Sequence, residues 1–98
     1  MIRQTGRFQT AHASKYMRQL CKHFAHKVPA ACDKTEGRVQ FPFGPATLHA
    51  SATELQAEIT GPDNAALERG RAVIDSHLKT FAFREGFTQM DWAAPTEG

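Results

Sequence analysis

The eight residues from Leu20 to Lys27 hold two histidines, two lysines and one of the two cysteines of this chain. Cys21, His23 and His26 are of the types that bind zinc, and a cysteine beside a histidine base can act as a nucleophile. A helix would disperse these groups, because at about 100° per residue Cys21 and His23 lie roughly 160° apart around the axis. His23 and His26 lie only about 60° apart. We therefore expect the thiol and the imidazoles to face different sides of the helix.

A metal site is the alternative to that expectation. His23 and His26 could share an ion, but a structural zinc site has four ligands. His77 is the first candidate for a further ligand, and His12, His49 or an acid are others. The cofactor would then be zinc, iron or haem; otherwise no cofactor is expected. The plainer interpretation is that His23 packs at the helix edge and forms a hydrogen bond with a neighbouring element.

A cysteine nucleophile would need a nearby base and a lowered pKa. The histidines next to Cys21 in the sequence point elsewhere on a helix, so a small buried thiol is the expected role of this residue. The sequence contains no glycine-rich phosphate loop, CxxC pair, HExxH motif or nucleophile elbow. We assign no catalytic residue, and a role other than catalysis is favoured.

Four residues that carry or can gain a positive charge recur at the spacing of one helix face: Lys15, Arg18, Lys22 and His26. Residues 1–27 contain no acid, whereas residues 28–98 contain six basic and ten acidic side chains. Like charges at this spacing slightly disfavour a helix. An anionic small molecule, an acidic protein surface or acids from the later part of the chain would offset that cost. A solvated helix face is the plainer alternative. Together with His23, these are the candidate ligand- or partner-binding residues.

Charge and hydropathy limit the classes of partner. A pI near 8.7 is below the level typical of a dedicated nucleic-acid binder, and no aromatic or amide residues alternate with these cations to read bases. No apolar run approaches the ~20 residues of a membrane span, and the first residues are too polar for a signal peptide. The two cysteines are too few for a disulfide framework. We expect a cytoplasmic protein with neither a membrane nor a nucleic-acid partner.

The elements that must position these residues follow from the periodicity of apolar residues. Tyr16, Met17, Leu20, Phe24 and Val28 recur at helical spacing and predict one apolar stripe. The predicted helices cover residues 14–27, with Ser14 as the N-cap, and a later stretch that begins at a cap on Asp63 or Asn64 and ends before Gly86. The predicted strands cover residues 5–10, 30–33, 38–43, 47–51 and 54–59, with a hairpin turn at Gly37 and a break at 43–46.

The order strand, helix, four strands, helix predicts an α+β fold of two layers, in which both helices cover one face of an antiparallel sheet. With 98 residues, 41% of them hydrophobic, the chain can fill one modest core. We expect a single domain over residues 1–92 and a flexible tail over residues 93–98. The polar face of the sheet would meet solvent, or it would join two copies in a homodimer. Its residues are Arg38, Gln40, His49, Gln56 and Glu58.

Four segments of the chain are similar to a known bacterial family: Gln19–Lys27, Phe41–Gly44, His77–Leu78 and Phe81–Glu85. They resemble the family catalogued as domain of unknown function 2218, and the resemblance covers about residues 5–87. It implies no activity and no catalytic residues. Some members of that family occur beside siderophore-handling and iron-uptake proteins.

The order of elements also resembles the TATA-binding-protein-like fold, seen in the C-terminal domain of phosphohexomutases. This chain lacks the phosphate-holding loop of those enzymes, so a sugar-phosphate role is not expected. The leading hypothesis is a small cytoplasmic binding or accessory domain whose basic helix holds an anion, an anionic iron chelate or an acidic partner. The alternative is a metal- or haem-binding protein that uses His23, His26 and His77.

Overall fold

Alternating apolar and polar residues form three consecutive antiparallel strands, β3 (Glu36–Phe41), β4 (Gly44–Ala50) and β5 (Glu54–Gly61). β1 (Ile2–Gln9) pairs with β5 along its whole length, and β2 (Ala30–Cys32) pairs with β3. The computed structural model describes residues 1–97. Two short strands, β6 (Asp91–Trp92) and β7 (Thr96–Glu97), pair with the other edge of β1. The sheet order is β2-β3-β4-β5-β1-β6.

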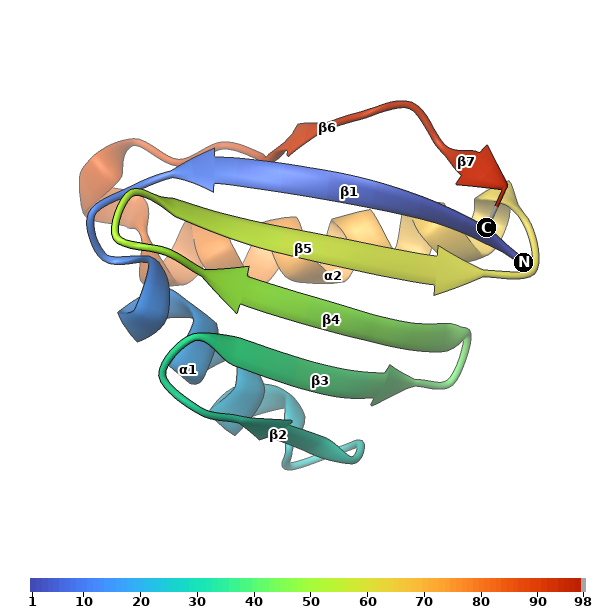
Figure 1. Ribbon diagram of the computed structural model, residues 1–98, viewed down its shortest axis with the longest axis horizontal. Helices are drawn as coiled ribbons and strands as arrows, with labels where there is room; N and C mark the ends of the chain where they lie inside the picture. The colour runs from blue at the N-terminus through green and yellow to red at the C-terminus, as the bar shows by residue number, and fades with distance from the viewer. Residues whose placement is uncertain (98) are drawn as a thin grey trace.

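Both helices, α1 (Ala13–Phe24) and α2 (Asn64–Phe81), lie on the same face of this sheet (Figure 1). One turn of 3-10 helix, η1 (Phe83–Glu85), follows α2. The predicted two-layer α+β fold and its element order are confirmed. The predicted cap is confirmed too, because the Asp63 carboxylate accepts a hydrogen bond from the backbone N–H of Ala66 at 2.9 Å. Within residues 1–97, neither helix is long and apolar enough to cross a membrane.

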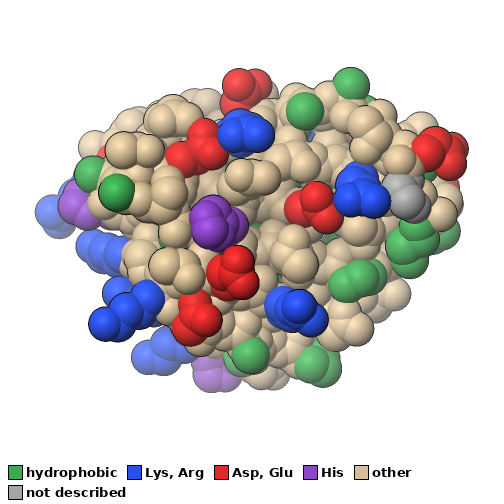
Figure 2. Space-filling view, in the orientation of Figure 1, with side chains coloured by type: hydrophobic (Ala, Val, Ile, Leu, Met, Phe, Trp, Pro, Cys, Tyr) green, Lys and Arg blue, Asp and Glu red, His purple; other side chains and the backbone are tan. Residues whose placement is uncertain are grey.

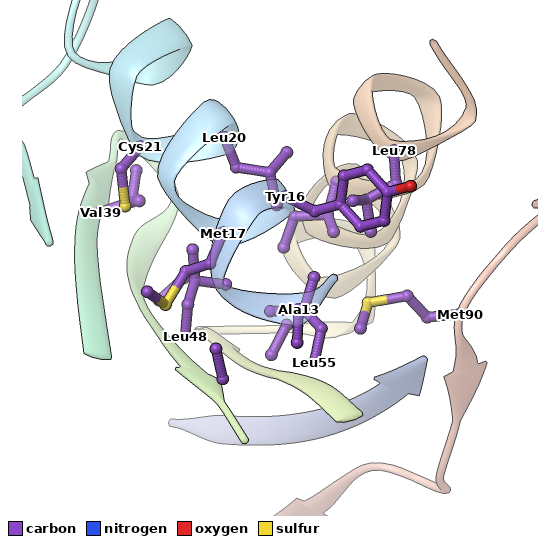
Figure 3. Close-up of a cluster of buried hydrophobic side chains, with 14 of the residues drawn as sticks. Ala13, Tyr16, Met17, Leu20, Cys21, Val39, Leu48, Leu55, Leu78 and Met90 are labelled. Carbon is purple, nitrogen blue, oxygen red and sulfur yellow. The ribbon is translucent and has the colours of Figure 1, made fainter. Parts of the chain in front are cut away.

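The core fills the space between the helices and the sheet (Figure 3). Tyr16, Met17, Leu20 and Phe24 of α1 form the predicted apolar stripe, and each is no more than 5% exposed. Burying a side chain of this size contributes ~1.5–3 kcal/mol, so the stripe fixes which face of α1 meets the sheet. The stripe packs on inward-facing residues of the strands and of α2, among them Val39, Leu48, Leu55, Ile59, Leu67 and Leu78.

The bounds of α1 differ from the prediction. The helix begins at Ala13 with His12 at the N-cap position, and Ser14 lies inside the first turn. The Ser14 hydroxyl does not cap the helix but donates a hydrogen bond to the Lys34 carbonyl at 2.6 Å. The helix ends at Phe24, three residues before the predicted limit at Lys27. The backbone carbonyl of Phe24, the last of the helix, accepts hydrogen bonds from the N–H groups of residues 27 and 28, each at 2.9 Å, so this helix end leaves it no missing partner.

Both predicted breaks in the β2–β4 region are shifted. Gly37 is a strand residue of β3, and the preceding turn is closed by the Asp33 carboxylate, which accepts from two backbone N–H groups at 2.8 Å. Gly37 is instead needed for space, because a Cβ there would lie 2.8 Å from the Cys21 Sγ. The second turn is Pro42-Phe43, since Phe41 already pairs with Gly44.

The C-terminal segment folds back on the core edge, where Phe87 and Met90 are buried and Trp92 is partly buried. Asp75 of α2 anchors it, because its carboxylate accepts hydrogen bonds from the Met90 N–H and the Trp92 Nε1–H, both at 2.9 Å. Partial burial raises the pKa of Asp75. Residues 96–97, in the segment predicted as a flexible tail, form β7; Gly98 lies outside the described residues.

A substitution at Gly6 of β1 tests whether the C-terminal segment packs on the sheet, because a Cβ at this position would lie 2.7 Å from the Trp92 ring. We expect Gly6→Ala to lower the free energy of unfolding by roughly 1–3 kcal/mol and to shift the Trp92 fluorescence to the red. Urea denaturation measures the first effect. In a Trp92→Ala background the same change should cost much less. Equal losses in the two backgrounds would mean that the ring does not cover Gly6.

Candidate functional site

The predicted binding residues Lys15, Arg18 and Lys22 all lie exposed on α1. The ion pairs found among residues 1–97 are elsewhere, on the open face of the sheet: Arg3–Glu58, Arg7–Glu54 and His49–Glu36. Figure 2 shows acidic and basic side chains mixed across that face, while Lys and Arg side chains protrude along the left rim, where α1 lies in Figure 1. Within the described residues, the cations of α1 therefore have no ion-pair partner.

The beginning of α1 nevertheless has an acid close by. The Tyr16 hydroxyl donates a hydrogen bond to the Glu85 carboxylate, and Thr10 donates a second at 3.0 Å. The pKa of Glu85 is lowered mainly by the bond from Tyr16, then by Thr10 and by the positive charges of His12 and Lys15. The same bond, together with burial and the negative charge of Glu85, raises the pKa of Tyr16 to about 12. An acid from the later part of the chain thus offsets the charge at Lys15. Within residues 1–97, Glu85 forms no ion pair with Arg18 or Lys22.

The end of α1 brings two histidines together. The rings of His23 and His77, which come from α1 and α2, have centroids 4.4 Å apart. The His77 Nδ1 lies 2.5 Å from the Val73 carbonyl, so this nitrogen carries a hydrogen and donates it. The Nε2 of His77 is then the ring atom left to meet another group. His77 is half-buried, and this contact gives its Nδ1 a hydrogen-bond partner.

A hollow of about 390 Å³ opens beside this pair. Its walls come from the end of α1, the β3–β4 turn and α2, and they are mainly aromatic. Phe41 and Phe43 stack with their planes 11° apart and their centroids 5.0 Å apart. Phe24 meets Phe41 edge to face at 5.1 Å and His77 at 5.0 Å. Lys27 is the lysine that lines this hollow.

The local potential at this end of the helix is positive. The pKa of His23 is lowered by partial desolvation, and then by the charges of His77, His26 and Lys27. Four groups that carry or can gain positive charge therefore act on one another here. The side chains that line the hollow within residues 1–97 include no Asp or Glu.

The predicted metal ligands come together only in part. His23 and His77 are in contact, but no group of three or more His, Cys, Asp or Glu side chains within residues 1–97 could surround one ion. Cys21 is buried on the opposite side of α1 from the exposed His23, as the helix geometry predicted. Figure 3 shows the Cys21 sulfur directed toward Val39. Burial raises the pKa of Cys21 to about 12, with a further contribution from Cys32, so its thiol is a poor nucleophile.

Three features of this site were missed from the sequence. Phe41 and Phe43 were interpreted as alternating strand residues, whereas Phe43 lies in the turn and both line the hollow. Lys27 was left out of the site because it does not fall on the helical spacing of Lys15, Arg18, Lys22 and His26; the structure places it in the turn after α1, where it lines the hollow. The signal for the first two was Pro42, which lacks the N–H that a strand interior requires.

The comparisons with known proteins agree with this fold. The chain is similar to a Pseudomonas aeruginosa protein whose structure was solved by NMR, with 27% sequence identity, a TM-score of 0.79 and coverage of 95% of this chain and 96% of that one. No curated protein matches the chain. A model of an uncharacterised protein family conserved in bacteria matches residues 5–93, which confirms the resemblance seen in the sequence motifs. The chain therefore belongs to the bacterial family called domain of unknown function 2218.

Proposed function

We propose that this protein is a small cytoplasmic binding or accessory domain that holds an anionic ligand or an acidic partner surface along the basic face of α1. The basic face consists of Arg18, Lys22 and His23 of α1, with Lys15 at its start and His26 in the turn that follows the helix. One observation carries the proposal: Arg18 and Lys22 are exposed and form none of the ion pairs found among residues 1–97, whereas Arg3 and Arg7 on the sheet are paired.

The magnitudes favour several weak contacts rather than one strong contact. A single exposed ion pair contributes only ~0.2–1 kcal/mol, so a ligand must engage several of these cations to bind well. An anion also relieves the repulsion between Arg18 and Lys22, which stand four positions apart on the helix. Because exposed charges are screened over about 8–10 Å at moderate salt, binding should weaken as salt is added. An anionic iron chelate belongs to this class of ligand.

A metal- or haem-binding role is the second candidate, and the contact between His23 and His77 favours it. Two imidazoles would leave the other positions of a zinc or iron ion for water or a ligand from outside, because within residues 1–97 no third His, Cys, Asp or Glu side chain joins them. Metal analysis of protein purified without a histidine tag tests this role. A metal content far below one ion per chain, without any gain in melting temperature on adding zinc or ferrous iron, would rule it out.

The double variant Arg18→Glu/Lys22→Glu tests the basic face. We expect it to bind a fluorescein-labelled oligoglutamate peptide about tenfold more weakly than the parent, equivalent to about 1.4 kcal/mol, because repulsion replaces attraction. Fluorescence anisotropy at low salt measures the affinity. The free energy of unfolding should change by less than about 0.5 kcal/mol, as for most surface substitutions.

The control for this experiment is Arg38→Glu/Lys79→Glu, which makes the same change in net charge on the sheet face and on α2. We expect the control variant to keep most of the affinity of the parent. Equal weakening by both variants would mean that net charge, and not the basic face, attracts the peptide. Full affinity in the Arg18→Glu/Lys22→Glu variant would reject the proposal.

The pH dependence gives a second test. The pKa of His23 is below its ordinary value of 6.5, because the folded state disfavours the charged ring. The contribution of neutral His23 to stability is therefore present above pH 6.5 and is lost as pH falls through the folded-state pKa. A bound anion favours protonated His23 and must raise that pKa, so by linkage oligoglutamate binds more tightly as pH falls through it. NMR titration of the His23 ring, with and without peptide, measures the change. A pKa that stays constant or falls when the peptide binds would contradict a ligand beside His23.

A further inference from the structure

We propose that the hollow between the end of α1, the β3–β4 turn and α2 binds a small planar aromatic carboxylate, with its ring among the phenylalanines and its carboxylate at Lys27 and His23. This inference rests on the function proposed above, because the same positive end of α1 attracts the ligand. It adds a defined pocket and a class of molecule. It also moves the site away from Arg18 and Lys22, which do not line the hollow.

The size and the walls of the hollow fit such a ligand. Its volume of about 390 Å³ is within the range of about 300–1,000 Å³ that small-molecule sites occupy. Those sites are mostly apolar and hold a few polar groups that fix orientation. The same balance occurs here, where the aromatic rings and Val73 form the walls and Lys27, His23 and His77 supply the polar atoms.

The aromatic rings are arranged to accept another ring. Phe41 and Phe43 are nearly parallel, with their planes 11° apart, and Phe24 stands at 75° to Phe41. Phe41 and Phe43 are only half-buried, so part of their surface still meets water. A planar ligand can stack on one ring and present its edge to another, which are the two arrangements that aromatic pairs prefer. A flexible aliphatic chain would gain neither arrangement.

Charge complementarity makes the ligand an anion. Lys27 carries a full charge, and His77 and His26 add to the positive potential that lowers the pKa of His23. The described residues that line the hollow include no acid to neutralise these groups. A carboxylate accepts hydrogen bonds in its plane, so it can meet an ammonium and an imidazole N–H together. A cationic ligand would be repelled from the same position.

The test uses 2-naphthoate as the probe, with two matched comparators. 2-Naphthalenemethanol keeps the rings and lacks the charge, and hexanoate keeps the carboxylate and lacks the rings. We expect 2-naphthoate to bind in a saturable way and to shift the NMR signals of His23, Phe43 and His77. Both comparators should bind at least about tenfold more weakly, which corresponds to about 1.4 kcal/mol.

Two variants locate the site, and each has a control of the same chemistry. Lys27→Met and Phe43→Ala should each weaken 2-naphthoate binding about tenfold. Lys79→Met and Phe83→Ala should leave it unchanged, because Lys79 is exposed on α2 and Phe83 is 66% exposed outside the hollow. Circular dichroism checks that Phe43→Ala folds. If it does not, Val73→Met, which fills the hollow from α2, replaces it and should also weaken binding.

Four results would overturn this inference. Hexanoate that binds as tightly as 2-naphthoate would remove the aromatic requirement, and equal binding of the alcohol would remove the carboxylate. A lack of saturable binding would mean that the hollow is not a ligand pocket. NMR signals of the hollow that shift with protein concentration alone would mean the same, and would indicate that another copy of the chain occupies it. Oligoglutamate binding separates the proposals, because it depends on Arg18 and Lys22 and is expected to persist in Lys27→Met and Phe43→Ala.

Discussion

The burial of one face of α1 against the sheet determines where every charge on this helix must go. Met17 and Leu20 are fully buried, and Tyr16 and Phe24 are nearly so. Each of these contacts is stronger than any single surface ion pair, by the usual values of ~1.5–3 and ~0.2–1 kcal/mol. The helix therefore cannot rotate to bring its cations to acids elsewhere in the molecule. Its basic face points outward as a consequence of its apolar face.

The two ends of α1 differ in the charged groups that surround them. At its beginning, Glu85, the last residue of η1, accepts hydrogen bonds from Tyr16 and Thr10, so an internal acid lies near Lys15. At its end, the neighbouring groups are His77 and Lys27, which increase the positive potential instead. The side chains of Phe41 and Phe43 adjoin this second end. A positive potential beside an apolar hollow distinguishes a candidate ligand site from an ordinary solvated helix face.

Local patterns predicted the apolar stripe of α1 because residues 16, 17, 20 and 24 recur with the period of a helix. They also predicted the separation of Cys21 from the histidines, which follows from helix geometry alone. The contact of His23 with His77 was not predictable in this way, because it depends on how two helices approach each other across the sheet. The role of Gly37 was hidden for the same reason, since the atom that requires its small size belongs to Cys21 of another element.

The most direct test of this arrangement is a nuclear Overhauser experiment on the five histidine rings. We expect a strong cross-peak between the rings of His23 and His77, whose centroids are 4.4 Å apart, and none between the Cys21 Hβ protons and either ring. The opposite pattern, with Cys21 close to His23 and His26 and without a contact between His23 and His77, would contradict the orientation of α1 and the proposals that depend on it.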